Sequence, residues 1–326
     1  MNKKRILSGM RPTGKLHIGH YVGALENWIR LQNEYESFHL IADYHVLTTS
    51  LNCDDVYDNT IQMLIDWLAT GLNPEKSPFF RQSVIKEHTE LFLIFTMLIT
   101  AARLERNPTV KDQVRDLEIE NITYGHLGYP VLQAADILLY KGNAVPVGDD
   151  QVPHVEISRE IARRFNNQYG LTFPEPEPLL TQFSRLMGLD GNAKMSKSLN
   201  NTILLSDKSE EVIAKLKKAK TDPQKLRKND PGHPEVCLVF NYHKKFNPES
   251  VSEIEEGCRS GVLGCVDCKL KCASKINLFL EPIIEKRNYY ENNIDIVKNI
   301  LFDGEKRAKE VALTTMNEVR SKMRIG

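Results

Sequence analysis

The sequence has no run of roughly 18 apolar residues, and its first residues lack the apolar core of a secretory signal. We therefore expect a cytoplasmic protein that is not held in a membrane. The chain also has no excess of charge, because 43 basic residues balance 43 acidic ones. That balance argues against a protein that coats nucleic acid non-specifically, although a local basic face is compatible with it.

Two common phosphate-binding patterns are missing as well. The chain has neither the Walker pattern Gly-x-x-x-x-Gly-Lys-Ser/Thr nor the dinucleotide pattern Gly-x-Gly-x-x-Gly. It also has no internal repeat and no low-complexity stretch. A nucleotide site in this protein must therefore be built from other residues.

The composition that is present, 41% hydrophobic and 26% charged, is typical of a globular protein. A chain of 326 residues exceeds the usual domain of roughly 100–200 residues, which predicts two domains. Strand-like and helix-like patterns alternate up to residue 165 and predict an α/β fold, with a Rossmann-like parallel sheet covered by helices. The expected strands are 3–10, 38–43, 78–84 and 144–148, and the expected helices are 18–29, 55–68, 87–104, 130–140 and 155–165.

The pattern changes after the proline-rich segment 174–178, which we expect to lie on the surface. Beyond residue 200 no strand pattern is convincing. The helical patterns there cover 209–220, 248–257, 276–290 and 303–323. We therefore predict a first domain over residues 1–200, including a loop at 188–200, and a mostly helical domain over residues 201–326.

Residues His17-Ile18-Gly19-His20 stand at the start of the expected first helix. A helix start offers unpaired N–H groups and partial positive charge to a phosphate. Gly19 allows a ligand to approach the backbone closely, and both imidazoles can donate hydrogen bonds to phosphate oxygens. The same four residues also fit a capped helix with two surface histidines.

A second segment, Lys194-Met195-Ser196-Lys197-Ser198, lies far downstream and follows Gly191-Asn192. Its two ammonium groups on a mobile loop could close over the outer phosphates of a nucleotide as charge builds on the leaving group. Taken alone, the segment also fits a solvated basic loop. Taken together, the two segments could hold opposite sides of one triphosphate.

The two segments resemble the signatures of the class I aminoacyl-tRNA synthetases. The flanking segments 8–25, 42–48, 134–140 and 147–151 are similar to those of the bacterial tryptophanyl-tRNA synthetases, and the likeness runs from about residue 5 to the C-terminus. The resemblance implies that ATP with Mg²⁺ activates L-tryptophan to an adenylate, releasing pyrophosphate, and that the acyl group then passes to tRNA(Trp). It further implies a homodimer, a catalytic first domain, and a second domain that binds the tRNA anticodon.

The attacking carboxylate is already ionised at neutral pH, so the first step needs no general base. Catalysis must come from positioning and from donors that stabilise charge on the phosphates. The resemblance implies that four residues are catalytic: His17, His20, Lys194 and Lys197. It implies that the following residues also line the ATP site: Arg11, Pro12, Thr13, Gly19, Gly148, Asp149, Asp150, Leu186, Met195, Ser196 and Ser198.

Asp136 stands inside an otherwise apolar helix and needs a partner there. An ionised carboxylate only accepts hydrogen bonds and an indole N–H only donates them, so the two match. A structural role for this carboxylate, paired with an arginine or a helix end, is the other reading. The resemblance implies that Gln133, Gln151, Tyr129 and His45 also bind the amino acid. Gln133 departs from the methionine common in the family, which keeps tyrosine open as the substrate.

Five of the six cysteines fall between Cys237 and Cys272. Such clustering in a reducing compartment favours a metal site over disulfides. Cys237, Cys258, Cys265 and Cys268 resemble the pattern of a subset of the family that carries a [4Fe–4S] cluster near the anticodon-binding region. We prefer that cluster to Zn²⁺, since only one Cys-x2-Cys pair is present. Thiols without metal are the third reading, and Cys272 could replace one ligand.

Other features bear on partners. A basic stretch from Lys215 to Lys228 could follow tRNA phosphates or be a solvated face, and Phe240, Tyr242 and Phe246 could stack on bases. The apolar segment 87–104 could be a dimer interface or core. Three alternatives remain: a tyrosine-specific synthetase, a small-molecule nucleotidyltransferase, and a non-catalytic RNA-binding or redox-sensing paralogue.

Overall fold

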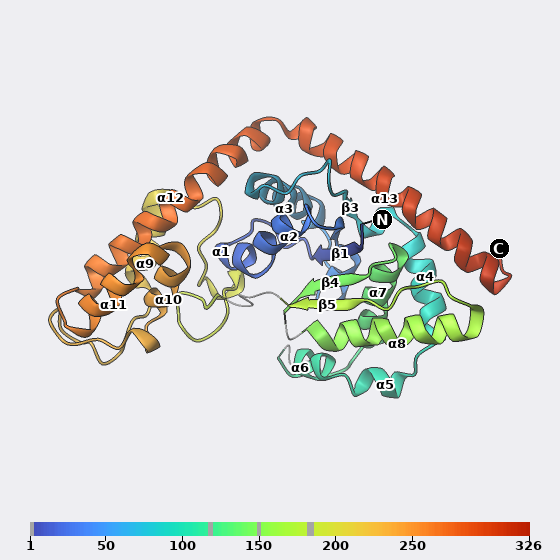
Figure 1. Ribbon diagram of the computed structural model, residues 1–326, viewed down its shortest axis with the longest axis horizontal. Coiled ribbons are helices and arrows are strands. Elements are labelled where there is room, and N and C mark those ends of the chain that lie inside the picture. The colour runs from blue at the N-terminus through green and yellow to red at the C-terminus, as the bar shows by residue number, and fades with distance from the viewer. Residues whose placement is uncertain (1–2, 117–119, 149–150, 181–185) are drawn as a thin grey trace. The chain divides into compact units, whose positions relative to one another are not determined.

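The computed structural model describes residues 3–116, 120–148, 151–180 and 186–326 (Figure 1). The chain forms two compact units. The first unit contains Met1–Gly14, Ala24–Ser184 and Asn293–Gly326, and the second contains Lys15–Gly23 and Arg185–Asn292. Compactness does not test function, so the predicted functional division at residue 200 stays a prediction.

The first unit is built on a parallel sheet of five strands: β1 (Arg5–Met10), β2 (Glu36–Ile41), β3 (Phe79–Arg81), β4 (Ala144–Val147) and β5 (Glu177–Leu180). The strand order is β3-β2-β1-β4-β5. The chain thus builds outward from β1 in one direction and then reverses to add β4 and β5. This order confirms the predicted Rossmann-like α/β fold, and it places a topological switch point between β1 and β4.

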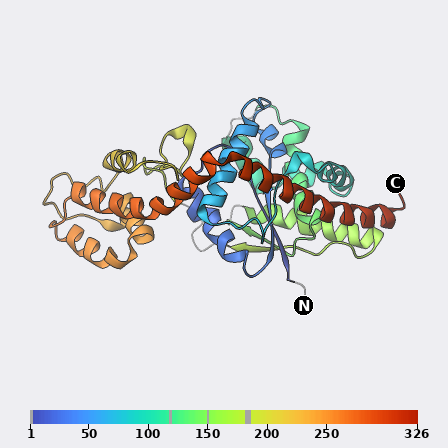
Figure 2. The same ribbon diagram turned by 90° about the horizontal axis from the view of Figure 1, so that it is seen from above.

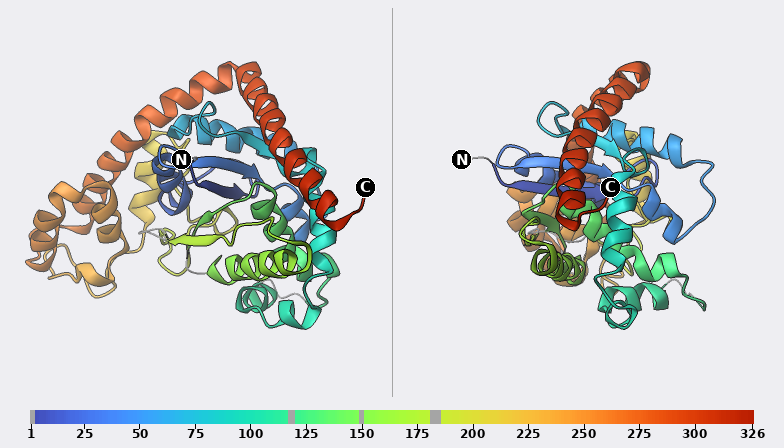
Figure 3. Two further views of the ribbon diagram at one scale, coloured as in Figure 1. Left: turned by 45° about the vertical axis from the view of Figure 1, so that its right-hand side comes forward. Right: turned by 90° about the vertical axis from the view of Figure 1, so that its right-hand side faces the viewer.

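Helices flank this sheet in the first unit: α2 (Glu26–Leu31), α3 (Val56–Thr70), α4 (Glu87–Thr96), α5 (Ala101–Glu105), α6 (Pro108–Asp116), α7 (Tyr124–Leu139), α8 (Val152–Tyr169) and α13 (Ile294–Met323). Helix α3 ends with Gly71 as its C-cap, whose φ of 109° suits the left-handed conformation there. Helix α7 packs between α4 and α8 (Figure 3). The element that carries Asp136 is therefore held on both sides.

Several elements differ from the sequence prediction. No strand was predicted in segment 174–178, yet β5 begins inside it. Pro178 is tolerated because β5 is an edge strand with one unpaired side. The expected helix 87–104 breaks into α4 and α5, because Thr100 caps a new helix with its side chain. Helix α7 starts six residues before Pro130, and α6 was not predicted.

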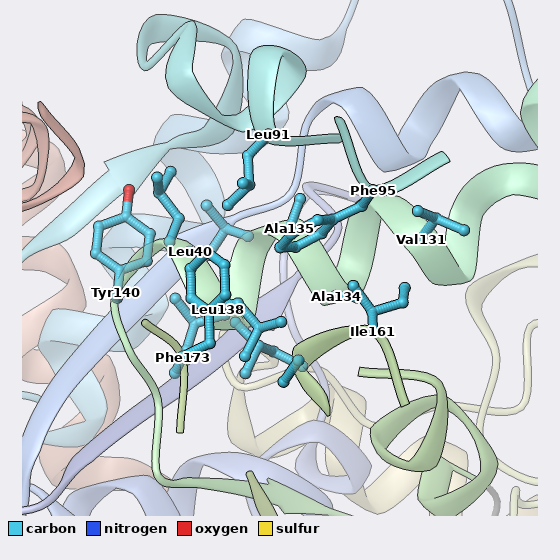
Figure 4. Close-up of a cluster of buried hydrophobic side chains, with 14 of the residues drawn as sticks. Leu40, Leu91, Phe95, Val131, Ala134, Ala135, Leu138, Tyr140, Ile161 and Phe173 are labelled. Carbon is cyan, nitrogen blue, oxygen red and sulfur yellow. The ribbon is translucent and has the colours of Figure 1, made fainter. Parts of the chain in front are cut away.

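The main hydrophobic core lies between the sheet and helices α4, α7 and α8 (Figure 4). The rings of Phe38 and Tyr140 stack with centroids 4.9 Å apart, and Phe95 meets Phe173 edge-on at 5.5 Å. Both contacts involve fully or nearly fully buried rings. Close packing of this kind resists rotamer changes, so it fixes the position of α7.

The last helix, α13, packs on β3, α3, α4 and α7 of the first unit (Figure 3). Gly304 permits the contact, because a Cβ there would lie 2.1 Å from the carbonyl oxygen of Phe79. Arg81 donates to Glu305 over 2.6 Å beside this contact. The end of the chain therefore belongs to the same unit as the sheet.

The second unit is mostly helical. It contains α1 (Ile18–His20), α9 (Ser209–Lys218), α10 (Leu238–Phe246), α11 (Val251–Arg259) and α12 (Cys265–Asn292). Helix α12 packs on α9 and α10, and α10 packs on α11 (Figure 2). A π-helical turn, Tyr21–Leu25, continues α1. No helix in the described part of the chain is long and apolar enough to cross a membrane.

Candidate active site

A cavity of about 240 Å³ lies in the first unit at the switch point of the sheet. Residues of β1, β2, β4 and α7 line it. Ligands of doubly wound sheets bind at this place, and the volume is near the lower end of the roughly 300–1,000 Å³ of small-ligand pockets. The cavity brings together Arg11 and the five residues predicted to bind the amino acid: His45, Tyr129, Gln133, Asp136 and Gln151.

Asp136 has only 1% of its surface exposed, and its carboxylate accepts three hydrogen bonds. Gln82 donates to Oδ1 over 2.7 Å, and Nδ1 of His88 lies 2.6 Å from the same oxygen. Nε2 of His45 lies 3.0 Å from Oδ2. A carboxylate offers about four acceptor positions. One position is therefore left on Oδ2, the oxygen shared with the cavity-lining His45.

The charge of Asp136 follows from these partners. Burial by itself would raise the pKa of Asp136, but the hydrogen bonds from His45 and His88 outweigh it and lower the pKa to about 2. The carboxylate is thus ionised at neutral pH and can only accept hydrogen bonds. Nε2 of His88 lies 3.0 Å from the Tyr140 hydroxyl, which donates to it. This chain of contacts fixes both carboxylate oxygens in place.

The other predicted residues give the cavity a neutral polar lining. The hydroxyl of Tyr129 lies 2.6 Å from Nε2 of the fully buried His154. Burial raises the pKa of Tyr129, so its hydroxyl stays protonated at neutral pH. Gln133 is half-buried on the same helix, and Gln151 occupies the N-cap position of α8. The cavity therefore contains the buried carboxylate of Asp136 and the guanidinium of Arg11 beside these neutral hydrogen-bonding groups.

His17-Ile18-Gly19-His20 lies in the second unit, with His17 at the N-cap of α1. The backbone N–H of His17 donates to Nδ1 of His20 over 3.2 Å, and the two rings lie 3.7 Å apart. Since Nδ1 of His20 accepts a hydrogen bond, a neutral ring must carry its proton on Nε2. The contact thus leaves the Nε2–H group of His20 as the donor that can bind a ligand.

Both signature imidazoles are neutral at pH 7. Burial, followed by the charge of Lys197, lowers the pKa of His17 to about 4. Burial, His17, Lys197 and Lys194 together hold the pKa of His20 well below its usual value. A neutral imidazole still has one N–H group, so each ring can donate to a phosphate oxygen without first gaining a proton.

The lysine loop, residues 186–201, forms a hairpin in the second unit. Met195 donates its N–H to the carbonyl of Leu186 over 3.3 Å, and Met187 pairs with Lys194 in an isolated antiparallel bridge. Lys194 is exposed, and its ammonium group bonds to no other described residue. The ammonium group therefore extends from a defined stem while remaining available to a ligand.

A buried asparagine closes the loop. Asn201 has 2% of its surface exposed, and its Oδ1 accepts the N–H of Ser196 over 2.7 Å. Its Nδ2 donates to Asp190 over 3.1 Å. On the other side of the loop, the ammonium group of Lys197 donates to the carbonyl of Lys15 over 3.1 Å. The loop is thus tied both to itself and to the segment just before His17.

The two signatures lie side by side within the second unit. The N–H of Ile18 donates to the carbonyl of Ile203 over 2.9 Å, which pairs the start of α1 with the segment after the lysine loop. A Cβ at Gly19 would lie 3.3 Å from Cβ of Met195 and 2.9 Å from Nδ1 of His17. Glycine is therefore required here by close packing, in addition to any ligand.

The remaining residues predicted for the ATP site fall into two groups. Four lie on the segments that follow β1 and β4: Arg11, Pro12, Thr13 and Gly148. Three lie outside what the structure describes in full: Asp149, Asp150 and the side chain of Ser198. Arg11 lines the cavity and donates to the hydroxyl of Thr49 over 3.4 Å.

The cysteines form no disulfide. Burial, and then the neighbouring thiols of Cys237, Cys258 and Cys265, raise the pKa of Cys268 to about 12. The pKa of Cys268 thus responds to three other thiols, and the pKa of the buried Cys272 is raised by burial and then by Cys268 and Cys237. Within residues 3–116, 120–148, 151–180 and 186–326, no three or more His, Cys, Asp or Glu side chains are arranged to hold a metal ion. The predicted metal site stays a prediction.

The candidates for RNA contact are only partly accessible. Lys215 pairs with Asp207, and the ammonium group of the buried Lys225 donates to the carbonyl of Asp230 over 2.6 Å. The exposed members of the basic stretch are Lys217, Lys218, Lys220, Arg227 and Lys228. Two of the three aromatic candidates, Phe240 and Tyr242, are buried and cannot stack on bases.

Sequence reasoning missed the residues that surround the predicted ones. Gln82 and His88 precede Asp136 by 54 and 48 positions. His154 lies behind Tyr129, and Asn201 closes the lysine loop. No short motif marks these contacts. His88 stands in a polar segment, between Glu87 and Thr89, so its sequence gives no sign that it is fully buried.

Comparisons with known proteins point the same way. The family model "tRNA synthetases class I (W and Y)" matches residues 1–281. A tryptophan–tRNA ligase of Thermotoga maritima is 48% identical over 328 residues, which is 98% of this chain and 99% of the relative. A tryptophan–tRNA ligase of Aquifex aeolicus is 45% identical over 394 residues, which is 98% of this chain and 100% of the relative. The crystal structure of tryptophanyl-tRNA synthetase from Campylobacter jejuni with ADP and tryptophan matches this chain with a TM-score of 0.87 and 33% sequence identity. The match covers 98% of this chain and 100% of that one.

Proposed function

The chain belongs to the class I tRNA synthetases of the tryptophan and tyrosine type, and we propose that it is a tryptophan–tRNA ligase. It activates L-tryptophan with ATP to tryptophanyl-adenylate and pyrophosphate, then passes the tryptophanyl group to tRNA(Trp). The observation that carries the choice of amino acid is the buried, ionised Asp136 with one acceptor position left. The relatives reported above support it.

Tryptophan is selected by its indole N–H, which donates to Oδ2 of Asp136. The three existing hydrogen bonds prevent the carboxylate from turning away. A site built in this way rejects analogues without the donor, because the acceptor would be left unpaired. Tyr129, Gln133 and Gln151 bind the remaining polar groups of the amino acid. The shape of a cavity fitted to the indole disfavours tyrosine, whose hydroxyl could otherwise replace the indole N–H.

ATP is bound through the two signatures of the second unit. Neutral His17 and His20 donate to phosphate oxygens, and Gly19 lets the nucleotide approach the backbone. Lys194 and Lys197 neutralise the leaving pyrophosphate, with Mg²⁺ as the accompanying counter-charge. We assign four further residues of the second unit to this site: Leu186, Met195, Ser196 and Ser198. In the first unit, the residues proposed to bind ATP on the basis of the sequence are Arg11, Pro12, Thr13, Gly148, Asp149 and Asp150.

Formation of the adenylate requires no proton acceptor. The tryptophan carboxylate attacks the α-phosphorus, a new C–O–P link forms, and the bond to the β-phosphate oxygen breaks. The electron pair leaves with pyrophosphate. The protein's contribution is therefore to orient the two substrates and to stabilise negative charge, and donors serve both purposes.

Amino-acid-dependent exchange of pyrophosphate into ATP tests the assignment. Purified protein should exchange with tryptophan, while tyrosine at the same concentration should give a rate at least a hundredfold lower. Exchange driven by tyrosine and not by tryptophan would establish the alternative substrate. Exchange with neither, together with failure to charge tRNA(Trp), would overturn the synthetase assignment and leave a nucleotidyltransferase or a non-catalytic paralogue.

The setting of the enzyme is part of the proposal. It acts in the cytoplasm as a homodimer and binds tRNA through exposed basic residues of the second unit, among them Lys217 and Lys218. Phosphate contacts by lysine make the KM for tRNA rise with salt. A change of Lys217 and Lys218 to glutamine should raise that KM and leave tryptophan-dependent exchange unchanged. An unaltered KM would exclude this surface.

We assign a [4Fe–4S] cluster to the four neighbouring thiols of Cys237, Cys258, Cys265 and Cys268. Four cysteines form the usual ligand set of such a cluster, and the absence of disulfides among them fits it. The iron ions would supply positive charge that stabilises the thiolate forms, which burial disfavours by raising the pKa of Cys237, Cys258 and Cys268. Absorption near 400 nm in protein purified without oxygen, with about four iron atoms per chain, is the expected result. About one zinc and no iron would select Zn²⁺ instead.

A further inference from the structure

Helix α10 presents one buried face to three different parts of the second unit. Its residues Tyr242, His243 and Phe246 fall on that face, since positions three and four apart in a helix are neighbours. Tyr242 and His243 have no exposed surface. The opposite face carries the exposed Asn241 and Lys244. The chemistry proposed above uses none of these residues.

Tyr242 contacts the stem of the lysine loop. Its hydroxyl donates to the carbonyl of Met187 over 2.6 Å. Met187 is the residue that pairs with Lys194 across the hairpin, and the neighbouring Leu186 accepts the N–H of Met195. One phenolic hydroxyl thus anchors the strand whose partner carries a catalytic ammonium group. A buried tyrosine with a single partner of this kind constrains position more than it adds stability.

The same helix is joined to the cysteine group. Cys237 forms the N-cap of α10. His243, the residue after Tyr242, has its Nε2 3.1 Å from the carbonyl of Cys268 and 3.4 Å from its sulfur. Asn247 contacts Nδ1 of His243 over 3.0 Å and so orients the ring. Two of the four neighbouring cysteines are therefore held at α10 itself.

The far end of α10 reaches the first signature through two aromatic contacts. The ring of Phe246 lies 5.2 Å from that of Phe279 on α12, which meets the ring of Tyr21 edge-on at 4.8 Å. Tyr21 directly follows His20. These distances are those of favourable aromatic pairs. Helix α10 therefore contacts the lysine loop directly and the histidine segment through Phe279.

We propose that Tyr242 is a positioning residue for the lysine loop, and that through it α10 makes the placement of Lys194 depend on the cysteine group. The inference rests on the proposed function, because the loop is taken to act on ATP. It goes beyond that function by linking the cysteine group to the activation step, whereas RNA binding alone would leave activation unaffected.

The first test is Tyr242→Phe, which removes one hydroxyl and keeps the ring. Loss of the hydrogen bond should lower kcat of tryptophan-dependent exchange about tenfold and raise the KM for ATP. The KM for tryptophan should not change, because the amino-acid cavity lies in the first unit. Tyr290→Phe, at the end of α12, is the matched control and should behave as wild type. An unchanged kcat, or equal rises in both KM values, would overturn the positioning role.

A second readout does not need activity. Trypsin cleaves after lysine, and opening of the stem should expose the bonds after Lys194 and Lys197. Limited proteolysis of Tyr242→Phe should cut there several-fold faster than wild type, with equal rates at other sites. Equal cutting in the two proteins would overturn the inference. If the wild-type protein shows no exchange at all, the proposed function is wrong. The proteolysis result would still decide whether Tyr242 holds the loop.

The link to the cysteine group needs a double-mutant cycle. Cys258 lies on α11, which packs on α10, so Cys258→Ser tests transmission through α10. The change should lower exchange and speed loop proteolysis in the wild-type background, and add little to either in Tyr242→Phe. No effect of Cys258→Ser alone, or effects that multiply fully in the double variant, would show that α10 does not transmit the state of the cysteines.

Discussion

Replacing Asp136 by asparagine changes one atom and removes the charge on which tryptophan recognition depends. The amide oxygen can take the place of Oδ1 and still accept from Gln82 and His88. The amide nitrogen then stands at Oδ2, where it meets His45, whose ring can accept in its other tautomer. The internal contacts are thereby largely kept. The indole N–H has no such choice, because it can only donate, and it is left facing another donor.

The loss can be estimated from the contacts. A hydrogen bond to a charged partner contributes roughly 1.5–3 kcal/mol, and 1.4 kcal/mol corresponds to a factor of ten. The Asp136→Asn variant should therefore lose about 10- to 140-fold in kcat/KM for tryptophan in the exchange assay. The KM for ATP should stay the same, since the nucleotide is bound by other residues. Thermal unfolding close to that of wild type is the check that the network survives.

A tryptophan analogue in which sulfur replaces the indole N–H isolates the interaction. Wild-type enzyme should prefer tryptophan over this benzothiophene analogue by the same factor, about 10- to 140-fold. Asp136→Asn should use both amino acids almost equally well. If wild type does not distinguish them, or if the variant distinguishes them as strongly as wild type, the indole N–H does not bind Asp136 and the recognition argument is wrong.

Three further predictions concern packing and protonation. Gly304→Ala places a Cβ 2.1 Å from the Phe79 carbonyl and should lower the free energy of unfolding by about 2 kcal/mol or more; unchanged urea unfolding would contradict the packing of α13. Burial lowers the pKa of His39 to about 3. As pH falls below about 6.5, only the unfolded chain gains a proton at this residue. The free energy of unfolding therefore falls by roughly 2 kcal/mol at pH 5. In His39→Leu, the drop in unfolding free energy from pH 7 to pH 5 should be smaller than in wild type by this amount. An equal drop in the two proteins would refute the role of His39. Gly19→Ala would place a Cβ 2.9 Å from Nδ1 of His17 and should lower exchange at least tenfold; wild-type exchange would show that the segment tolerates bulk.

Much of the fold was accessible from local patterns. The alternation of strand-like and helix-like patterns predicted the parallel sheet, because that alternation is typical of α/β folds. The strand at 177–180 was not predicted, because Pro178 argues against a strand. The proline is permitted only because this strand lies at the edge of the sheet. The start of α7 escaped for a related reason. A proline usually marks the first turn of a helix, but Pro130 lies within α7.

The site divides in the same way. The signature residues and Asp136 could be found because each breaks its local pattern: paired histidines at a helix start, paired lysines in a loop, and an acid in an apolar helix. Their supporting partners could not, because His45 and Asp136 are 91 positions apart and meet only through the sheet topology. The contact between Tyr242 and Met187 spans 55 positions and likewise leaves no local signal.

The central claim is that two sequence-distant signatures act on one ATP while the amino-acid cavity works separately from them. Changing both Lys194 and Lys197 to alanine tests it most directly, by tryptophan-dependent exchange and by equilibrium binding of tryptophan. Loss of each charge-stabilising donor costs roughly a hundredfold or more, so exchange should fall by at least three orders of magnitude while the Kd for tryptophan stays within twofold. Exchange that continues at the wild-type rate would contradict the account.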